Sequence, residues 1–352
     1  MLKTIPIGED GLVLGYRDTG PPTQGSTYLT VVLIHGLVFH GGIFSRMEPY
    51  ASSHNLRLVS VNMRDYPGSS PFTPTELNKL ASADHEVQDD LIHAQAHEVA
   101  IFLERFIQVE QIPPIDDRSG IRQGGLALVG WSMGNVFSIS ILAHARHFHT
   151  DALEEYLRTV VIYDTPNVII GEPPLDGVYH PMMHPMAPEE RCRAFLHWCA
   201  SYYEPIRDIS SLDNNTVRAR RALHEISDDH TRTPTITRMS PDEFSYTADN
   251  DVFQRSGQYM RNIPPQVFYR NAQRALCDTE GILPTVDVIV IWCDMSPSVA
   301  AWAAKRLKER VDTARAEGKH TRAVRVINIK DANHFVHWED PERMVKFFAQ
   351  NI

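Results

Sequence analysis

The sequence predicts an α/β fold in which a mostly parallel sheet is flanked by helices and carries a helical insertion. Six short runs of β-branched and aliphatic residues have the character of buried strands. Helical patterns separate these runs, and one long segment without such a run follows the fourth of them. Strands that alternate with helices form parallel sheets with helices on both faces. With 352 residues, the chain is long enough for one such core and a large insertion.

The first three strands lie in the N-terminal part of the chain. From Tyr28, a strand buried on both faces is predicted by the run YLTVVLIHG. A helix is predicted at GGIFSRMEPYASSHN and a second strand at LRLVSVNM, which ends in a turn around Pro67 and Gly68. From about residue 84 to 107, apolar side chains recur at helical spacing. The third strand is predicted at LALV, and it runs directly into another helix.

A long segment of different character interrupts the remaining strands. The fourth strand is predicted at LRTVVIYDTP, the fifth at VDVIVIWCD and the sixth at AVRVINI. Between residues 167 and 283, prolines, histidines, aromatic residues and charged helical stretches replace the strand signal. We therefore expect a core formed by residues 1–166 and 284–352 and a helical cap formed by residues 167–283. Four aromatic residues of the cap are expected either to line a pocket or to pack against the core: Phe195, Trp198, Tyr202 and Tyr203.

Composition and charge exclude several classes of partner. The formal net charge of −10 argues against binding to nucleic acid or anionic membranes, since both require clustered Lys and Arg. The N-terminus lacks the apolar stretch of a signal peptide, and no apolar run approaches the ~20 residues of a membrane span. We expect a cytoplasmic protein that binds a hydrophobic small molecule and neither nucleic acid nor membrane. Homodimer formation remains open.

The sequence contains no signal for a metal or a cofactor. The four cysteines lack the spacing of a disulfide framework, and reduced thiols are expected at Cys192, Cys199, Cys277 and Cys293. The spacing of these cysteines also disfavours a metal site. No cofactor and no metal ion are therefore predicted.

A nucleophile elbow is predicted at Gly130-Trp131-Ser132-Met133-Gly134, between a strand and a helix. A strand-to-helix turn this sharp crowds the backbone at the serine, so the residues two before and two after must be small. The turn exposes the hydroxyl above the sheet edge. Ser132 is therefore the predicted nucleophile, and the alternative is a glycine-lined turn with an inert serine.

Two backbone N–H groups are predicted to form an oxyanion hole. Acyl transfer needs preorganised donors for the oxygen that becomes negatively charged. In a fold with this elbow, one donor is the residue after the nucleophile, Met133, and the other lies in the loop after the neighbouring strand. We assign the second donor to Leu37, in the loop that follows His35 and Gly36. The His35 side chain is expected to order this loop.

The predicted general base is His334, in the segment DANHFVHWEDP after the last strand. A loop after the final strand of such a sheet delivers the base to the serine when the chain order is Ser, acid, His. His337 is the alternative, but His334 follows the strand at the shorter distance.

These motifs resemble a known superfamily. In their order and spacing, HGL, RDYPGSS, GWSMGN and NHFVHWEDP are similar to the α/β-hydrolases, over about residues 10–165 and 283–350. More narrowly, IYDTP, EPPLDGVYHP, FLHWCASYY and WCDMSP look like fungal hydrolases of toxin and secondary-metabolite pathways. The resemblance implies a Ser-His-acid hydrolase with a cap over its pocket. It also implies a hydrophobic ester, lactone or thioester as the substrate, with Ser132 and His334 in the catalytic roles.

The acid departs from the superfamily pattern. Its usual site is an Asp three residues after a glycine that ends the penultimate strand, and here Ser296 occupies that position. Some members carry the acid at the end of the strand after the nucleophile helix, where this sequence has Asp164. Asp164 is therefore the predicted acid, and Asp294 is the alternative. Asp164 could instead cap the turn that follows its strand.

Three functions fit these residues. The first is hydrolysis of an ester, lactone or thioester through an acyl-enzyme formed on Ser132. The second is a non-hydrolytic reaction of a biosynthetic pathway at the same site, by a cyclase, lyase or acyltransferase. The third is a ligand-binding receptor that retains the pocket. Epoxide hydrolase and dehalogenase chemistry are disfavoured, because both need a carboxylate at position 132.

Overall fold

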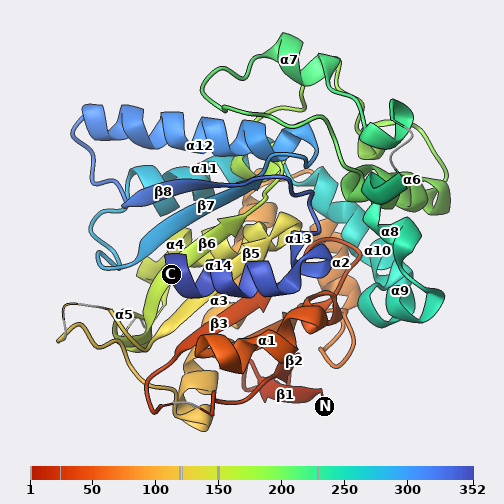
Figure 1. Ribbon diagram of the computed structural model, residues 1–352. Coiled ribbons are helices and arrows are strands. Elements are labelled where there is room, and N and C mark those ends of the chain that lie inside the picture. Colours follow the sequence, from red (N-terminus) through yellow and green to blue (C-terminus); the bar gives the residue numbers. More distant parts are fainter. Residues whose placement is uncertain (1, 24, 119, 121, 149–150, 228–229) are drawn as a thin grey trace.

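In the computed structural model, an eight-stranded sheet forms the centre of the molecule (Figure 1). The structure describes residues 2–352 except 24, 119, 121, 149–150 and 228–229. The strands of the described residues are β1 (Lys3–Pro6), β2 (Val13–Asp18), β3 (Leu29–Ile34), β4 (Leu56–Asn62), β5 (Leu126–Trp131), β6 (Leu157–Tyr163), β7 (Asp287–Cys293) and β8 (Val324–Ile329).

Helices precede and follow most of these strands. Outside residues 167–283, the described α-helices are α1 (Glu48–Ala51), α2 (Pro74–Leu80), α3 (His85–Glu110), α4 (Asn135–His144), α5 (Asp151–Tyr156), α12 (Ser298–Ala316), α13 (Val336–Glu339) and α14 (Pro341–Asn351). Short 3₁₀ helices are η1 (Gly41–Met47), η2 (Ser52–His54), η3 (Ser132–Gly134) and η4 (Ala145–His147).

The strand order is β1-β2-β4-β3-β5-β6-β7-β8. The six strands from β3 to β8 pair in parallel, whereas β1 and β2 pair antiparallel with each other and β2 pairs antiparallel with β4. The predicted fold class, a mostly parallel sheet flanked by helices, is confirmed. All six predicted strands are present.

The N-terminal hairpin of β1 and β2 was not predicted from the sequence. It begins at the edge of the sheet, where only Ile5 of the four β1 residues is buried. An edge strand with exposed side chains lacks the apolar run by which a buried strand is recognised. The turn closes with a hydrogen bond from Ile7 N to Leu12 O at 2.8 Å.

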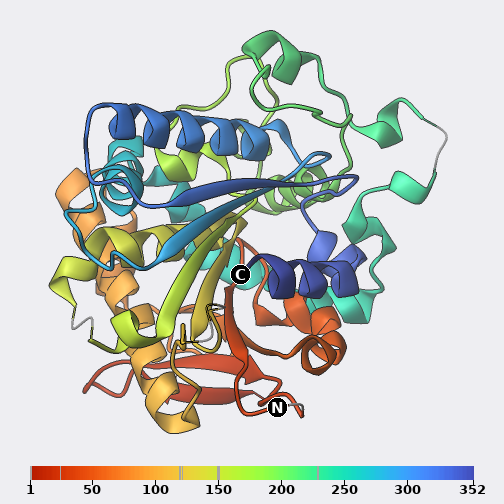
Figure 2. The ribbon, with the colours of Figure 1, turned by 60° about the vertical axis from the view of Figure 1, so that its left-hand side comes forward.

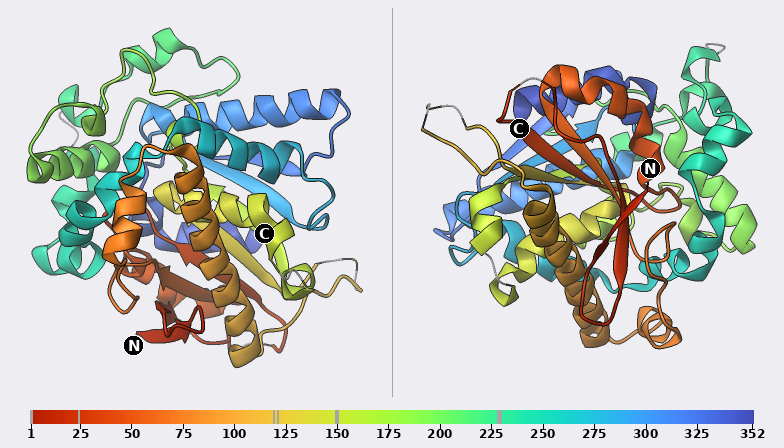
Figure 3. Two further views of the ribbon diagram at one scale, coloured as in Figure 1. Left: turned by 180° about the vertical axis from the view of Figure 1, so that it is seen from behind. Right: turned by 90° about the horizontal axis from the view of Figure 1, so that it is seen from below.

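Side chains of the parallel strands alternate between two hydrophobic cores. In β3, Val32 and Ile34 lie in the core formed with α3, α4 and α12, whereas Val31 and Leu33 lie in the core with α1 and α14. Figure 1 looks onto the face covered by α1 and α14, and the left panel of Figure 3 shows α3 and α4 on the opposite face. Full burial of one such side chain stabilises the fold by about 1.5–3 kcal/mol. The two cores therefore hold the sheet rigid beneath its loops.

Residues 167–283 form a helical segment, and its described residues contribute no strand to the sheet (Figure 2). Its α-helices are α6 (Pro188–Ala200), α7 (Asn214–Ala219), α8 (Thr235–Arg238), α9 (Pro241–Thr247), α10 (Asn250–Arg255) and α11 (Pro265–Ala272). Its shorter helices are η5 (Asn167–Ile170), η6 (Pro181–Met183), η7 (Leu223–Glu225), η8 (His230–Arg232), η9 (Gly257–Asn262) and the π-helix η10 (Gln273–Cys277). The two helices nearest the C-terminal end of this segment, α11 and η10, pack along α4 (Figure 3).

Among the described residues, none of the helices combines the length and the apolar character that a bilayer crossing requires. All four cysteines are described, and all are buried free thiols.

Candidate active site

Neighbouring strands bring the predicted site residues to one edge of the sheet. β5 pairs in parallel with β3 on one side and with β6 on the other, and β7 and β8 follow. Leu37 follows β3, Ser132 follows β5 and Asp164 follows β6. Asp294 comes directly after β7, and His334 lies in the loop after β8. Because the carboxyl ends of parallel strands meet at one edge, these five residues share that edge.

Ser132 sits in a tightly packed turn. Its backbone φ of 55° lies in the left-handed region, which residues other than glycine rarely adopt. A Cβ atom at Gly36 would lie 2.9 Å from Ser132 Cβ, so the loop after β3 touches the predicted nucleophile. Asn135 Nδ2 donates a hydrogen bond to Ser132 O at 2.9 Å. Strained backbone of this kind persists only where the surroundings fix it.

Replacing Gly134 with alanine is expected to disturb this turn. The added Cβ would lie 2.5 Å from Ile34 O and 2.7 Å from His35 O, which are backbone atoms that cannot move aside cheaply. We expect a loss of about 1–3 kcal/mol in the free energy of unfolding, measured by urea denaturation. Gly8→Ala is the control, because the nearest atom there belongs to the mobile carboxylate of Asp10. Equal stability of the two variants would contradict the prediction.

The structure brings His334 and Asp164 together. Nδ1 of His334 lies 2.6 Å from Asp164 Oδ2. Since a carboxylate accepts, Nδ1 carries the proton and Nε2 is left free to accept one. The same carboxylate accepts from Cys293 N at 2.9 Å and from Ser296 Oγ at 2.6 Å. Three hydrogen bonds therefore hold the Asp164 side chain, which is 1% exposed, in one orientation.

Ser296 is a site residue that the sequence alone did not reveal. In the sequence it is only the residue that stands in the usual position of the acid. In the structure, its hydroxyl donates to the carboxylate of Asp164 from the neighbouring strand end. The substitution at the usual position was the signal, but a sequence does not show which carboxylate a serine will face.

Asp294 lies apart from His334. Its Oδ1 accepts a hydrogen bond from Ala332 N at 3.2 Å, and burial raises the pKa of this carboxyl. Within the described residues, no hydrogen bond joins Asp294 to His334. The side chain of Asp294 therefore supports the loop that carries the imidazole, and it does not contact the imidazole itself.

His337, the alternative base, is buried below the site. Its Nδ1 lies 3.1 Å from Tyr163 OH, and its ring packs against Trp131 at 4.5 Å between centroids. Burial lowers the pKa of His337 well below its usual value. The indole of Trp131 also donates to His334 O at 3.0 Å, so this aromatic cluster fixes the backbone of the loop with His334.

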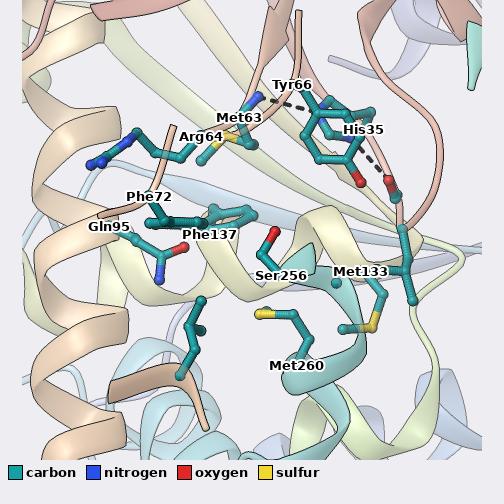
Figure 4. Close-up of a pocket in the computed structure, with 14 residues that line it drawn as sticks. His35, Met63, Arg64, Tyr66, Phe72, Gln95, Met133, Phe137, Ser256 and Met260 are labelled. Carbon is teal, nitrogen blue, oxygen red and sulfur yellow. Dashed lines mark hydrogen bonds between the residues drawn. The ribbon is translucent and has the colours of Figure 1, made fainter. Parts of the chain in front are cut away.

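Leu37 and Met133 both line the large cavity that also contains Ser132. Within the described residues, the backbone N–H of Leu37 has no protein acceptor. The His35 side chain orders this loop, as Figure 4 shows: Nδ1 lies 2.9 Å from Gly36 O, and Met63 N donates to Nε2 at 3.1 Å. A carbonyl can only accept, so His35 is the neutral tautomer with its proton on Nδ1.

Stability is expected to fall in acid because His35 must stay neutral. Burial lowers the pKa of this imidazole to about 3, whereas an unfolded histidine has a value of 6.5. Between these values the unfolded chain binds one proton more, so each pH unit below 6.5 costs about 1.4 kcal/mol for this group. The free energy of unfolding, measured in urea from pH 7.5 to about pH 5, should change little above about pH 6.5 and decrease below it. A flat profile would contradict this assignment.

A small cavity of about 50 Å³ lies behind the same loop (Figure 4). Leu37, Met133 and Met260 line both this cavity and the large one, so their side chains form the wall between the two. The polar side chains of Gln95 and Ser256 also reach the small cavity.

The large cavity has a volume of about 650 Å³ and lies between the sheet edge and the helical segment. Ser132, Asp164 and His334 line its floor. From the helical segment, the walls include Met182, Met183, Phe195, Trp198, Met260 and Phe268. Such predominantly apolar walls with a few convergent polar groups are typical of small-molecule sites.

Two of the four predicted lid aromatics reach this cavity. Phe195 and Trp198 line it, whereas Tyr203 lines a separate cavity beside Arg220. Tyr202 is buried elsewhere, with the guanidinium of Arg232 5.1 Å from its ring. The methionine walls were not predicted, since nothing in the sequence distinguishes a cavity methionine from a core methionine.

Comparison with known proteins identifies relatives at the level of the family. A model described as the alpha/beta hydrolase family matches residues 31–347. None of the curated proteins matches the sequence.

Several solved structures share the fold. An N-acyl homoserine lactone degrading enzyme is 14% identical, with a TM-score of 0.52 and coverage of 99% of this chain and 100% of that chain. An enzyme variant that cleaves the ring of the Pseudomonas quinolone signal is 13% identical, with a TM-score of 0.52 and coverage of 99% and 98%. A haloalkane dehalogenase loop variant from Bradyrhizobium elkanii is 13% identical, with a TM-score of 0.51 and coverage of 99% and 95%. Identities this low establish a common fold and leave the reaction open.

Proposed function

Because the chain belongs to the alpha/beta hydrolase family, we propose that it is a serine hydrolase for an ester, lactone or thioester of a hydrophobic small molecule. In this proposal Ser132 is the nucleophile, His334 the base and Asp164 the acid. The observation that carries the proposal is the 2.6 Å hydrogen bond between His334 and Asp164 on the floor of a cavity that Ser132 also lines.

Acylation follows from the protonation states of these groups. His334 Nε2 takes the proton from Ser132 Oγ while the oxygen attacks the substrate carbonyl carbon. The carbonyl oxygen becomes an oxyanion, which accepts hydrogen bonds from Leu37 N and Met133 N. Asp164 keeps the proton of the imidazole on Nδ1 and stabilises the imidazolium. As the intermediate collapses, the bond to the leaving alcohol or thiol breaks and His334 donates the proton to it.

Deacylation repeats these steps with water. His334 removes a proton from a water molecule, whose oxygen attacks the acyl carbon bound to Ser132 Oγ. The second oxyanion uses the same two N–H donors. The carboxylic acid then leaves, and the proton returns to Ser132 Oγ. The enzyme is regenerated, and the net reaction consumes one water.

The walls of the cavity support a hydrophobic substrate. Methionine side chains are flexible and polarizable, so Met182, Met183 and Met260 can adapt to ligands of different shape. The helical segment acts as the cap of this pocket in the proposal. The resemblance of its sequence to fungal hydrolases of secondary-metabolite pathways agrees with a hydrophobic small molecule as the substrate.

A substrate screen with product analysis tests the proposal. Purified protein is incubated with matched series of esters, lactones and thioesters in oxygen-labelled water, and products are identified by mass spectrometry. We expect free acids that carry one labelled oxygen, because water releases the acyl group. Ser132-dependent products without labelled oxygen would instead indicate a cyclase, lyase or acyltransferase. Ligand binding without any product would indicate a receptor.

Trp198→Ala is expected to change substrate selectivity more than catalysis. Removing the indole enlarges the cavity, so short substrates lose contacts and their KM should rise roughly tenfold, while kcat changes little. The kcat/KM of bulkier esters should rise relative to that of short esters. Tyr202→Phe serves as the control, because its ring is buried outside the cavity. An unchanged ratio of kcat/KM between short and bulky esters in Trp198→Ala would contradict a pocket role.

A further inference from the structure

The loop between β7 and α12 is held from two sides. On one side, Ser296 Oγ donates a hydrogen bond to Asp164 Oδ2 at 2.6 Å. On the other side, the Arg220 guanidinium donates to the backbone oxygens of Ser296 at 2.9 Å and Asp294 at 3.0 Å. It also donates to the Ser298 hydroxyl at 3.1 Å. Arg220 directly follows α7, so this second grip comes from the helical segment (Figure 1).

Other contacts fix Arg220 in this place. Its Nε donates to Glu204 O at 2.7 Å, and its guanidinium carbon lies 5.4 Å from the ring centre of Tyr203. The backbone of Tyr203 also contacts the loop between β7 and α12, since Tyr203 N donates to Met295 O at 2.9 Å. Four of the five guanidinium N–H donors can be accounted for by these bonds.

The half-buried guanidinium of Arg220 makes no direct ion pair among the described residues. Burial lowers the pKa of the guanidinium to about 10, so it remains charged at neutral pH. Oxygen atoms of neutral groups receive all four hydrogen bonds, and the carboxylates of Asp294 and Asp164 lie nearby and favour the cation. A guanidinium that makes several hydrogen bonds in fixed directions holds its acceptors firmly.

We propose that Arg220 is a positioning residue for the acid. It fixes the loop so that Ser296 can hold the Asp164 carboxylate toward His334. Arg220, Ser296, Asp164 and His334 then form one chain of contacts from the helical segment to the base. This inference rests on the proposed function, and it adds that docking of the helical segment and orientation of the acid are coupled.

Steady-state kinetics of single variants provide the first test. Ser296→Ala removes the hydroxyl and leaves the backbone bonds of Arg220 in place, while Arg220→Lys keeps the charge and loses the planar fork. Each variant should lower kcat roughly ten- to a hundredfold with KM within about threefold of wild type. Arg221→Gln, which removes a charge from the exposed neighbouring side chain, is the control and should retain wild-type kcat. Wild-type kcat in Ser296→Ala or Arg220→Lys would overturn the proposal.

A double-mutant cycle separates positioning from a general structural role. Both substitutions are repeated in an Asp164→Asn background and assayed with an activated fluorogenic ester. If they act through the Asp164 carboxylate, they should lower the residual rate by no more than roughly threefold. Losses that multiply in this background would overturn the proposal, even if both single variants are impaired. If the proposed function itself is wrong, Ser132→Ala remains active or the Ser132-dependent products carry no labelled oxygen. If only this inference is wrong, Ser132→Ala is inactive, the products are labelled acids and the cycle is additive.

Discussion

Ser132→Ala is expected to lower turnover by about 10⁵-fold or more, because the change removes the atom that forms the acyl-enzyme. The fold should be unaffected, since the side chain loses only one oxygen and Oγ makes no hydrogen bond within the described residues. Ligand binding should persist, because the loss of one oxygen hardly changes the shape of the cavity. Rates are measured with the best ester, lactone or thioester from the substrate screen.

Ser140→Ala is the matched control for this prediction. Ser140 is a buried serine of α4, and its Oγ lies 3.4 Å from Asn271 Nδ2, away from the large cavity. It should retain turnover within a fewfold of wild type. If Ser132→Ala kept activity within about tenfold, a difference of ~1.4 kcal/mol in activation free energy, the covalent mechanism would be excluded.

Asp164→Asn is expected to lower kcat by roughly 10⁴-fold without unfolding the protein. An amide in place of the carboxylate can donate to Nδ1 of His334 and so favours the tautomer with its proton on Nε2. That tautomer cannot accept the proton of Ser132. The amide also no longer stabilises the imidazolium that forms during attack.

Asp294→Asn separates the two acid candidates. An asparagine oxygen can still accept the hydrogen bond from Ala332 N, so this variant should lose far less activity. Both variants are assayed for kcat with the same substrate, and their thermal midpoints are compared with wild type. A crippled Asp294→Asn next to a nearly silent Asp164→Asn would contradict the assignment of Asp164.

The turn at Ser132 and the place of His334 at the same sheet edge could be predicted because each depends on the local sequence. A strand that turns directly into a helix at Ser132 requires small residues at fixed offsets, and Gly130 and Gly134 show this in the sequence. The packing at Gly134, where a Cβ would lie 2.5 Å from Ile34 O, is the physical origin of that pattern. His334 could be predicted because it lies in the loop directly after the last strand.

For the acid, the sequence favours Asp164 and leaves Asp294 as the alternative, since both carboxylates follow adjacent parallel strands. Asp164 directly follows β6 and Asp294 directly follows β7, so the sequence places both at the same edge. Which one meets His334 depends on the path of the loop after β8, which no local pattern encodes. The role of Arg220 depends on contacts over more than 70 residues of sequence and was beyond prediction for the same reason.

Labelling with a fluorophosphonate probe, followed by intact-protein and peptide mass spectrometry, is the most direct test of Ser132 as an activated nucleophile. We expect a single covalent adduct on Ser132 in the wild-type protein. We expect no adduct in Ser132→Ala, and in Asp164→Asn the labelling rate should fall by about as much as the turnover rate. An unlabelled wild-type protein, or an adduct that persists in Ser132→Ala, would contradict Ser132 as the nucleophile.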